Sequence, residues 1–122
     1  MVITFYGVRG SIPSPGPATN KYGGNTSCVF VELDNGHNLI LDAGTGIRKL
    51  GKRLETDNST VNILLSHGHW DHIQGFPFFG PAYVPDNHFV IYGEPRGSRD
   101  IKDILSGQMA LPYFPVPLEV MR

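Results

Sequence analysis

Four side chains that can bind metal ions fall within six residues of this chain: His67, His69, Asp71 and His72. Imidazole nitrogens and a carboxylate oxygen together suit zinc, manganese or iron, and the absence of a cysteine among them argues against a structural zinc–thiolate site. His67 and His69 stand two residues apart, so in an extended backbone their side chains point the same way. The spacing therefore predicts a site for one or two divalent ions, with zinc foremost.

A carboxylate ends an apolar run earlier in the chain, at Asp42 in "LILDAG". One interpretation is a turn or cap residue. The other is a buried acceptor that holds the metal-binding loop in place through hydrogen bonds. The two remaining histidines, His37 and His88, stand at a turn and at a strand start, and are interpreted as ordinary solvated side chains. Cys28, inside a strand pattern, is interpreted as a small buried residue.

Strand patterns surround these residues. The first, "VITFYGV", is β-branched and aromatic. A β-hairpin is predicted where "CVFVEL" and "NLILDAG" flank the turn dipeptide Asn35-Gly36. The apolar run "VNILLS" predicts a strand buried on both faces, which delivers the histidine cluster at its carboxyl end. A further strand is predicted over "HFVIYG".

Two helices are expected among these strands. Ile47, Leu50 and Leu54 recur on one face of "GIRKLGKRLE", and Thr45 stands where a helix cap belongs. Ser98 is expected to cap a last helix over "RDIKDILSGQMA". Strands that alternate with helices predict a layered α/β domain.

Size and charge limit the classes of protein to consider. At 122 residues the chain is long enough for one domain with one hydrophobic core. Its net charge of −1 gives no electrostatic footprint for nucleic acid or for an anionic membrane. A single cysteine cannot form an intramolecular disulfide, and neither a signal peptide nor a membrane-spanning run is recognisable. The cytoplasm is therefore the expected location.

With these residues in place, the chain resembles the metallo-β-lactamase fold superfamily. The run His67-x-His69-x-Asp71-His72 is similar to the signature ligand motif of that superfamily, and Asp42 is similar to its first motif. The stretches "GVRGSIPSPGP", "YGGNTSC" and "HGHWDHIQGFPFFGPAY" look like a phosphodiesterase-like branch. That branch is similar to the phosphoribosyl cyclic phosphodiesterases and to the tRNA 3′-processing endonuclease.

The resemblance implies a four-layer αββα sandwich with a metal site at the edge of its sheet. It implies that His67 and His69 bind a first ion, that Asp71 and His72 bind a second, and that Asp71 orients the attacking water. It also implies a hydrolase that cleaves phosphodiester bonds, in a small molecule or a nucleotide, through a metal-activated water. No membrane partner is implied.

The chain also departs from the family. Family members complete their site with a histidine, a bridging aspartate and a final histidine from their second half, and this chain has no match to them. After His72 it holds only His88, which lies too early for any of these roles. Residues 1–122 are therefore expected to form a single incomplete domain, the N-terminal half of the sandwich. A C-terminal half or a homo-oligomer would complete it, and the chain alone is expected to be weak or inactive.

Two other functions share the ligand cluster. A non-catalytic, self-associating module would hold one ion with all four ligands and would pair with a second copy through an exposed sheet edge. β-Lactam hydrolysis shares the motif, but the flanking sequence favours phosphodiesters. No residue is singled out as binding the substrate. The metal-dependent hydrolase is the leading hypothesis.

Overall fold

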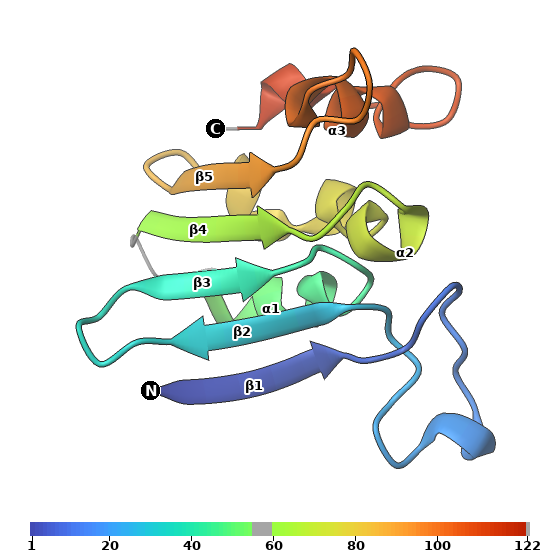
Figure 1. The fold of residues 1–122 in the computed structure, drawn as a ribbon, viewed down its shortest axis with the longest axis vertical. Helices are drawn as coiled ribbons and strands as arrows, with labels where there is room; N and C mark the ends of the chain where they lie inside the picture. The colour runs from blue at the N-terminus through green and yellow to red at the C-terminus, as the bar shows by residue number, and fades with distance from the viewer. Residues whose placement is uncertain (55–59, 122) are drawn as a thin grey trace.

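The computed structural model describes residues 1–54 and 60–121, and shows a five-stranded sheet with helices (Figure 1). The strands are β1 (Val2–Gly7), β2 (Cys28–Glu32), β3 (Asn38–Leu41), β4 (Thr60–Leu65) and β5 (His88–Gly93), and they lie side by side in this order. The pairs β1–β2 and β2–β3 are antiparallel, whereas β3–β4 and β4–β5 are parallel. The predicted layered α/β architecture is confirmed, and it corresponds to part of the expected sandwich.

The hairpin between β2 and β3 forms where the sequence predicts it. Gly36 adopts a φ of 82°, which a residue without a Cβ reaches at no steric cost. The Gly36 N–H donates to the Leu33 carbonyl at 3.0 Å and closes the turn. His37 in this turn and His88 at the start of β5 are both exposed, as expected of solvated side chains.

Helix α1 (Ile47–Leu54) packs Ile47, Leu50 and Leu54 into the core, as their spacing predicts. The prediction that Thr45 caps this helix is wrong. The Thr45 hydroxyl accepts from the Thr26 backbone N–H at 2.8 Å and donates to the Asn25 side chain at 3.2 Å. It ties the helix start to the loop before β2, because that loop supplies better-placed partners. The expected last residue, Glu55, lies outside the described residues.

Helix α3 (Ile101–Gln108) begins at a different cap from the one predicted. Asp100, not Ser98, accepts a hydrogen bond from the Asp103 N–H at 2.9 Å, and the Asp103 carboxylate accepts from the Asp100 N–H at 3.2 Å. This reciprocal capping box satisfies two amides that would otherwise lack partners. The carboxylate pair therefore outcompetes a single serine hydroxyl two residues earlier.

One face of the sheet forms the hydrophobic core with α1 and the short helices after β4. Phe30, Ile40 and Ile63 lie in register across β2, β3 and β4 and are almost fully buried. Phe79 and Leu50 close over them from the helical side. Cys28 belongs to this core and is fully buried, which confirms its interpretation as a packing residue.

The opposite face of the sheet is largely apolar and open to solvent in the described part of the chain. We call it the open sheet face, and it comprises Ile3, Phe5, Leu41, Leu64, Val90 and Tyr92, each at least 36% exposed. The strand register places four of these side chains in one row across the sheet. Phe5 and Leu41 both pair with Val29, Leu41 also pairs with Leu64, and Leu64 pairs with Tyr92. The prediction that β4 is buried on both faces is therefore wrong, since only one layer of helices covers the sheet.

Candidate metal centre

The histidine cluster and Asp42 meet at one edge of the sheet because β3 and β4 are parallel. Parallel strands deliver their carboxyl ends to the same edge. The backbone then joins the two loops directly. Ala43 N–H donates to the His72 carbonyl at 2.7 Å, and Gly75 N–H donates to the Ala43 carbonyl at 3.0 Å. The loop after β3 is thus a fixed platform for the loop after β4.

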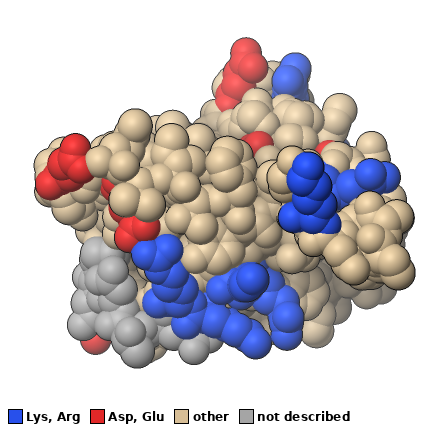
Figure 2. Space-filling model, turned by 90° about the horizontal axis from the view of Figure 1, so that it is seen from below, with Lys and Arg blue, Asp and Glu red and all other residues tan. Residues whose placement is uncertain are grey.

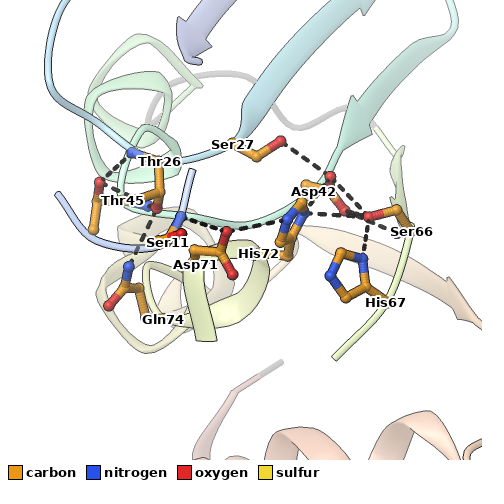
Figure 3. A network of polar contacts seen from close by, with 10 residues as sticks. All are labelled: Ser11, Thr26, Ser27, Asp42, Thr45, Ser66, His67, Asp71, His72 and Gln74. Carbon is orange, nitrogen blue, oxygen red and sulfur yellow. Dashed lines mark hydrogen bonds and ion pairs between the residues drawn. The ribbon is translucent and has the colours of Figure 1, made fainter. Parts of the chain in front are cut away.

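The ligand cluster spans the end of this loop and the short helix α2 (Trp70–Ile73). His69 is extended, with φ of −66° and ψ of 149°, and precedes the helix. The ring centroids of His67 and His69 are 4.4 Å apart, and those of His67 and His72 are 4.0 Å apart. The sequence prediction that His67 and His69 project together is confirmed. The turn of α2 adds His72 beside His67, and Asp71 lies on the other side of His72 (Figure 3).

Asp42 is the hub of the polar contacts in Figure 3. This residue is buried, at 8% exposure. The carboxylate accepts from the Ser66 N–H at 2.8 Å, from the Ser66 hydroxyl at 2.8 Å, from the Ser27 hydroxyl at 3.0 Å and from His72 Nδ1 at 2.8 Å. Burial opposes its ionisation, but the donors from Ser66 and His72 outweigh burial and lower the pKa of Asp42. An ionised Asp42 is an acceptor only.

The acceptor role of Asp42 decides which nitrogen of His72 carries the proton. His72 Nδ1 must donate to the carboxylate, so the neutral ring keeps its lone pair on Nε2. Ser66 has a single hydroxyl proton and gives it to Asp42, so it accepts from His67 Nδ1 at 3.0 Å. His67 is thereby left with its lone pair on Nε2 as well. Burial, followed by the nearby His72 and His69, lowers the pKa of His67, which favours the neutral ring that binds metals.

Asp71 faces the same space from α2. Its Oδ2 accepts from the Ser11 N–H at 2.9 Å, and this hydrogen bond is the main reason that the pKa of Asp71 is lowered. The same oxygen lies 3.3 Å from His72 Nε2. A carboxylate oxygen and an unprotonated ring nitrogen repel at this distance unless a proton or a cation stabilises them. Cations of the kind predicted from the sequence fit this pair of acceptors.

The donor set fits a divalent ion chemically, although its arrangement is not that of a closed metal site. Within residues 1–54 and 60–121, no three His, Cys, Asp or Glu side chains form a group that could hold an ion as it stands. His72 explains part of this, because both of its ring nitrogens already face carboxylates. Three imidazoles and one carboxylate on a braced loop are the ligands that zinc takes in hydrolytic sites. Metal binding by these four residues stays a prediction.

Three serines that sequence reasoning missed complete the centre. Ser66, Ser27 and Ser11 donate to Asp42 or Asp71 through a hydroxyl or a backbone N–H. Ser66 had a readable signal, since it is the first residue after β4 and directly precedes His67. Cys28 can be excluded as a ligand or nucleophile. Burial, followed by the charge of Asp42, raises the pKa of its thiol to about 12, so it is protonated at neutral pH.

The fold and this cluster agree with the family match. The Metallo-beta-lactamase superfamily matches residues 22–116, and the chain therefore belongs to this superfamily. No solved structure matches the chain. No helix in the described part of the chain is long and apolar enough to cross a membrane.

The relatives are proteins named ribonuclease Z. The chain is 30% identical over 120 residues to that of Natronomonas pharaonis, covering 93% of this chain and 35% of that protein. It is 33% identical over 109 residues to that of Halobacterium salinarum, covering 84% and 32%, and 34% identical over 110 residues to that of Picrophilus torridus, covering 85% and 32%. The chain thus spans about a third of the length of the curated relatives it matches. The expected resemblance is confirmed.

Proposed function

We propose that this chain carries the metal-binding half of a metal-dependent hydrolase that cleaves phosphodiester bonds in RNA. The observation that supports it most is the convergence of His67, His69, Asp71 and His72 on one braced loop, in a chain whose relatives are named ribonuclease Z. These four residues would hold one or two divalent ions, with zinc as the first candidate and manganese or iron as alternatives. A bound ion supplies an activated water and stabilises charge on phosphoryl oxygens.

The chain's own residues have separate tasks in this proposal. Asp42 fixes the ring of His72 and leaves Nε2 free, and Ser66 does the same for His67. The Ser11 N–H stabilises the ionised carboxylate of Asp71, so this side chain can orient a water by accepting a hydrogen bond from it. Ser11 lies in the long loop between β1 and β2, which gives that loop a part in the site.

Charge supports an RNA substrate more than the net value of −1 suggests. Helix α1 carries four basic side chains, Arg48, Lys49, Lys52 and Arg53, of which Arg53 is paired with Glu32 at 2.7 Å. On the face drawn in Figure 2, Lys and Arg side chains gather along the lower edge. A local group of this kind attracts a polyanion even where the total charge is near zero.

Replacing His69 by alanine tests the proposal. We expect zinc binding, followed by calorimetry, to weaken by at least about 100-fold, and metal-dependent cleavage of single-stranded RNA and of bis(p-nitrophenyl) phosphate to fall below detection. His37→Ala is the matched control, because His37 is an exposed histidine in the hairpin turn. Zinc affinity that survives His69→Ala would contradict the ligand assignment. A zinc-loaded wild-type chain that cleaves neither compound would contradict activity in these residues alone.

The open sheet face supports a second candidate, a metal-binding module that self-associates. We propose that this face packs against a further layer, supplied either by additional chain, as the length of the relatives suggests, or by a second copy. The 122 residues would then form a single, incomplete domain. Additional chain fits a hydrolase whose remaining metal ligands lie in that chain, and a second copy fits the self-associating module.

Native mass spectrometry distinguishes the two sources. If copies pair through this face, the wild-type chain is expected to be a dimer and Leu64→Thr with Tyr92→Thr a monomer, since threonine keeps the strand but removes apolar area. Tyr22→Thr changes a tyrosine outside the face that is more exposed than Tyr92, at 73% against 52%, and should leave the dimer intact. A wild-type monomer would rule out the self-associating module.

A further inference from the structure

A large cleft lies beside the metal-binding loop, and most of the residues that line it have no role in the hydrolytic chemistry described above. Its volume is about 1010 Å³, and the rings of His67 and His69 form part of its wall. The rest of the wall comes from α2 and the segment after it, from the turn after β5, and from α3 and the segment that follows it. Clefts of this size are large enough for a ligand bigger than a single phosphate group. The ligand must therefore offer more than the scissile bond.

Two arginines of a tight turn line this cleft. The Arg96 N–H donates to the Arg99 carbonyl at 2.9 Å, the Arg99 N–H donates to the Arg96 carbonyl at 3.1 Å, and Gly97 closes the turn at a φ of 61°. Residues that exchange both hydrogen bonds lie directly opposite and place their side chains on one side. Like charges so placed repel each other and cost stability.

No acidic partner relieves this repulsion. Within residues 1–54 and 60–121, neither Arg96 nor Arg99 forms an ion pair, and the cleft wall contains no Asp or Glu. The chain as a whole is slightly acidic, so a wall with only cationic charge is a local feature. Guanidinium groups bind phosphate through paired hydrogen bonds. The arginine pair therefore suits a phosphate group chemically.

Aromatic rings form the remainder of the wall. Trp70 is 78% exposed, Tyr113 is 83% exposed and Phe78 is 59% exposed, although rings of this size are normally covered. Phe78 is braced by Phe114, whose ring meets it edge to face at 5.6 Å. Trp70 stands between His69 and Asp71 in the ligand run, and it lines the cleft together with His67 and His69. Exposed rings beside cations are the usual platform for nucleobases.

We propose that this cleft binds a nucleotide adjacent to the scissile phosphodiester, with its base stacked on Trp70 and Tyr113 and its phosphate held by Arg96 and Arg99. The inference rests on the proposed function for the identity of the bond that is cleaved. Recognition of base and phosphate needs no metal ion, however, and can be measured without one. The nucleotide comes either from a single-stranded RNA or from a free nucleotide.

Trp70 is the only tryptophan in the chain, so its fluorescence reports directly on stacking in the cleft. We would titrate the full chain, with chelator present, using single-stranded RNA of about ten nucleotides, adenosine monophosphate and inorganic phosphate. RNA and adenosine monophosphate should both quench the fluorescence, and inorganic phosphate should not. Tighter binding of RNA than of the mononucleotide assigns the site to a polynucleotide. Equal affinities assign it to a free nucleotide.

Variants connect the quenching to the proposed contacts. Arg96→Gln with Arg99→Gln should weaken binding by about tenfold or more and reduce its dependence on salt. Tyr113→Ala should weaken it by about tenfold, while Tyr113→Phe keeps the ring and the affinity. Lys102→Gln, which removes an exposed positive charge on α3 outside the cleft, is the control.

Two results would overturn the inference: no quenching by either nucleotide, or wild-type affinity in the double arginine variant. The failures of the two proposals are separable. Quenching in a chain that hydrolyses nothing leaves the cleft assignment standing and removes the hydrolase. Zinc binding and cleavage that depend on His69, without any quenching, remove the cleft assignment alone.

Discussion

Replacing Asp42 by asparagine is expected to lower the zinc affinity of the chain by about 10- to 100-fold while leaving it folded. The amide keeps the size of the side chain and tolerates the φ of 62° at this position. It has only one acceptor oxygen, so either the Ser66 donors or His72 Nδ1 loses its partner. Without that partner the proton of the His72 ring can move to Nε2, and Nε2 then has no lone pair with which to bind an ion. Calorimetric titration with Zn²⁺ measures the change.

Asp42→Ala distinguishes the contribution of Asp42 to stability from its contribution to zinc binding. Alanine leaves the buried donors of Ser66 and Ser27 unpaired and is strained at a positive φ. The free energy of unfolding in urea should fall by about 2–4 kcal/mol. Normal zinc affinity in the asparagine variant, together with lost stability in the alanine variant, would mean that Asp42 is only a turn residue. That was the other interpretation that the sequence left open.

Local chemistry explains why much of the sheet is predictable. The dipeptide Asn35-Gly36 suits one turn geometry, and the strand patterns on either side of it leave little choice of pairing. The core face of α1 is readable because Ile47, Leu50 and Leu54 follow helical periodicity. The ligand cluster is readable for a similar reason, since its spacing is a property of the sequence alone.

Features that depend on distant parts of the chain are not readable in this way. An apolar run such as "VNILLS" shows that β4 is buried, but the number of covered faces depends on which layers pack against the sheet. Thr45 has a hydroxyl suited to a helix cap, yet this hydroxyl accepts a hydrogen bond from the backbone N–H of Thr26, which lies 19 residues earlier in the sequence. The cleft is a further example, because Trp70 and Arg96 meet only in the folded chain.

Replacing Gly44 by alanine is expected to lower the free energy of unfolding by about 3 kcal/mol and to displace the metal-binding loop. An added Cβ would lie 2.3 Å from the Asp71 carbonyl oxygen and 2.4 Å from the Thr26 hydroxyl. Neither neighbour can retreat cheaply, since the hydrogen bond between Ala43 and His72 ties the same two loops together. Urea denaturation followed by far-ultraviolet circular dichroism measures the stability, and zinc titration measures the displacement.

Gly107→Ala is the matched control, with an effect of opposite sign. Nothing lies within 4 Å of a Cβ at Gly107, which is inside α3. Alanine costs less entropy than glycine in a helix, so this variant should gain about 0.5–1 kcal/mol. The same glycine-to-alanine change then distinguishes the cost of a steric clash at Gly44 from the gain that reduced backbone freedom gives at Gly107. If Gly44→Ala is as stable as the wild type and binds zinc equally well, the loops after β3 and β4 need not touch. The position of Asp71 would then not depend on Gly44, and the braced loop on which the ligand assignment rests would be wrong.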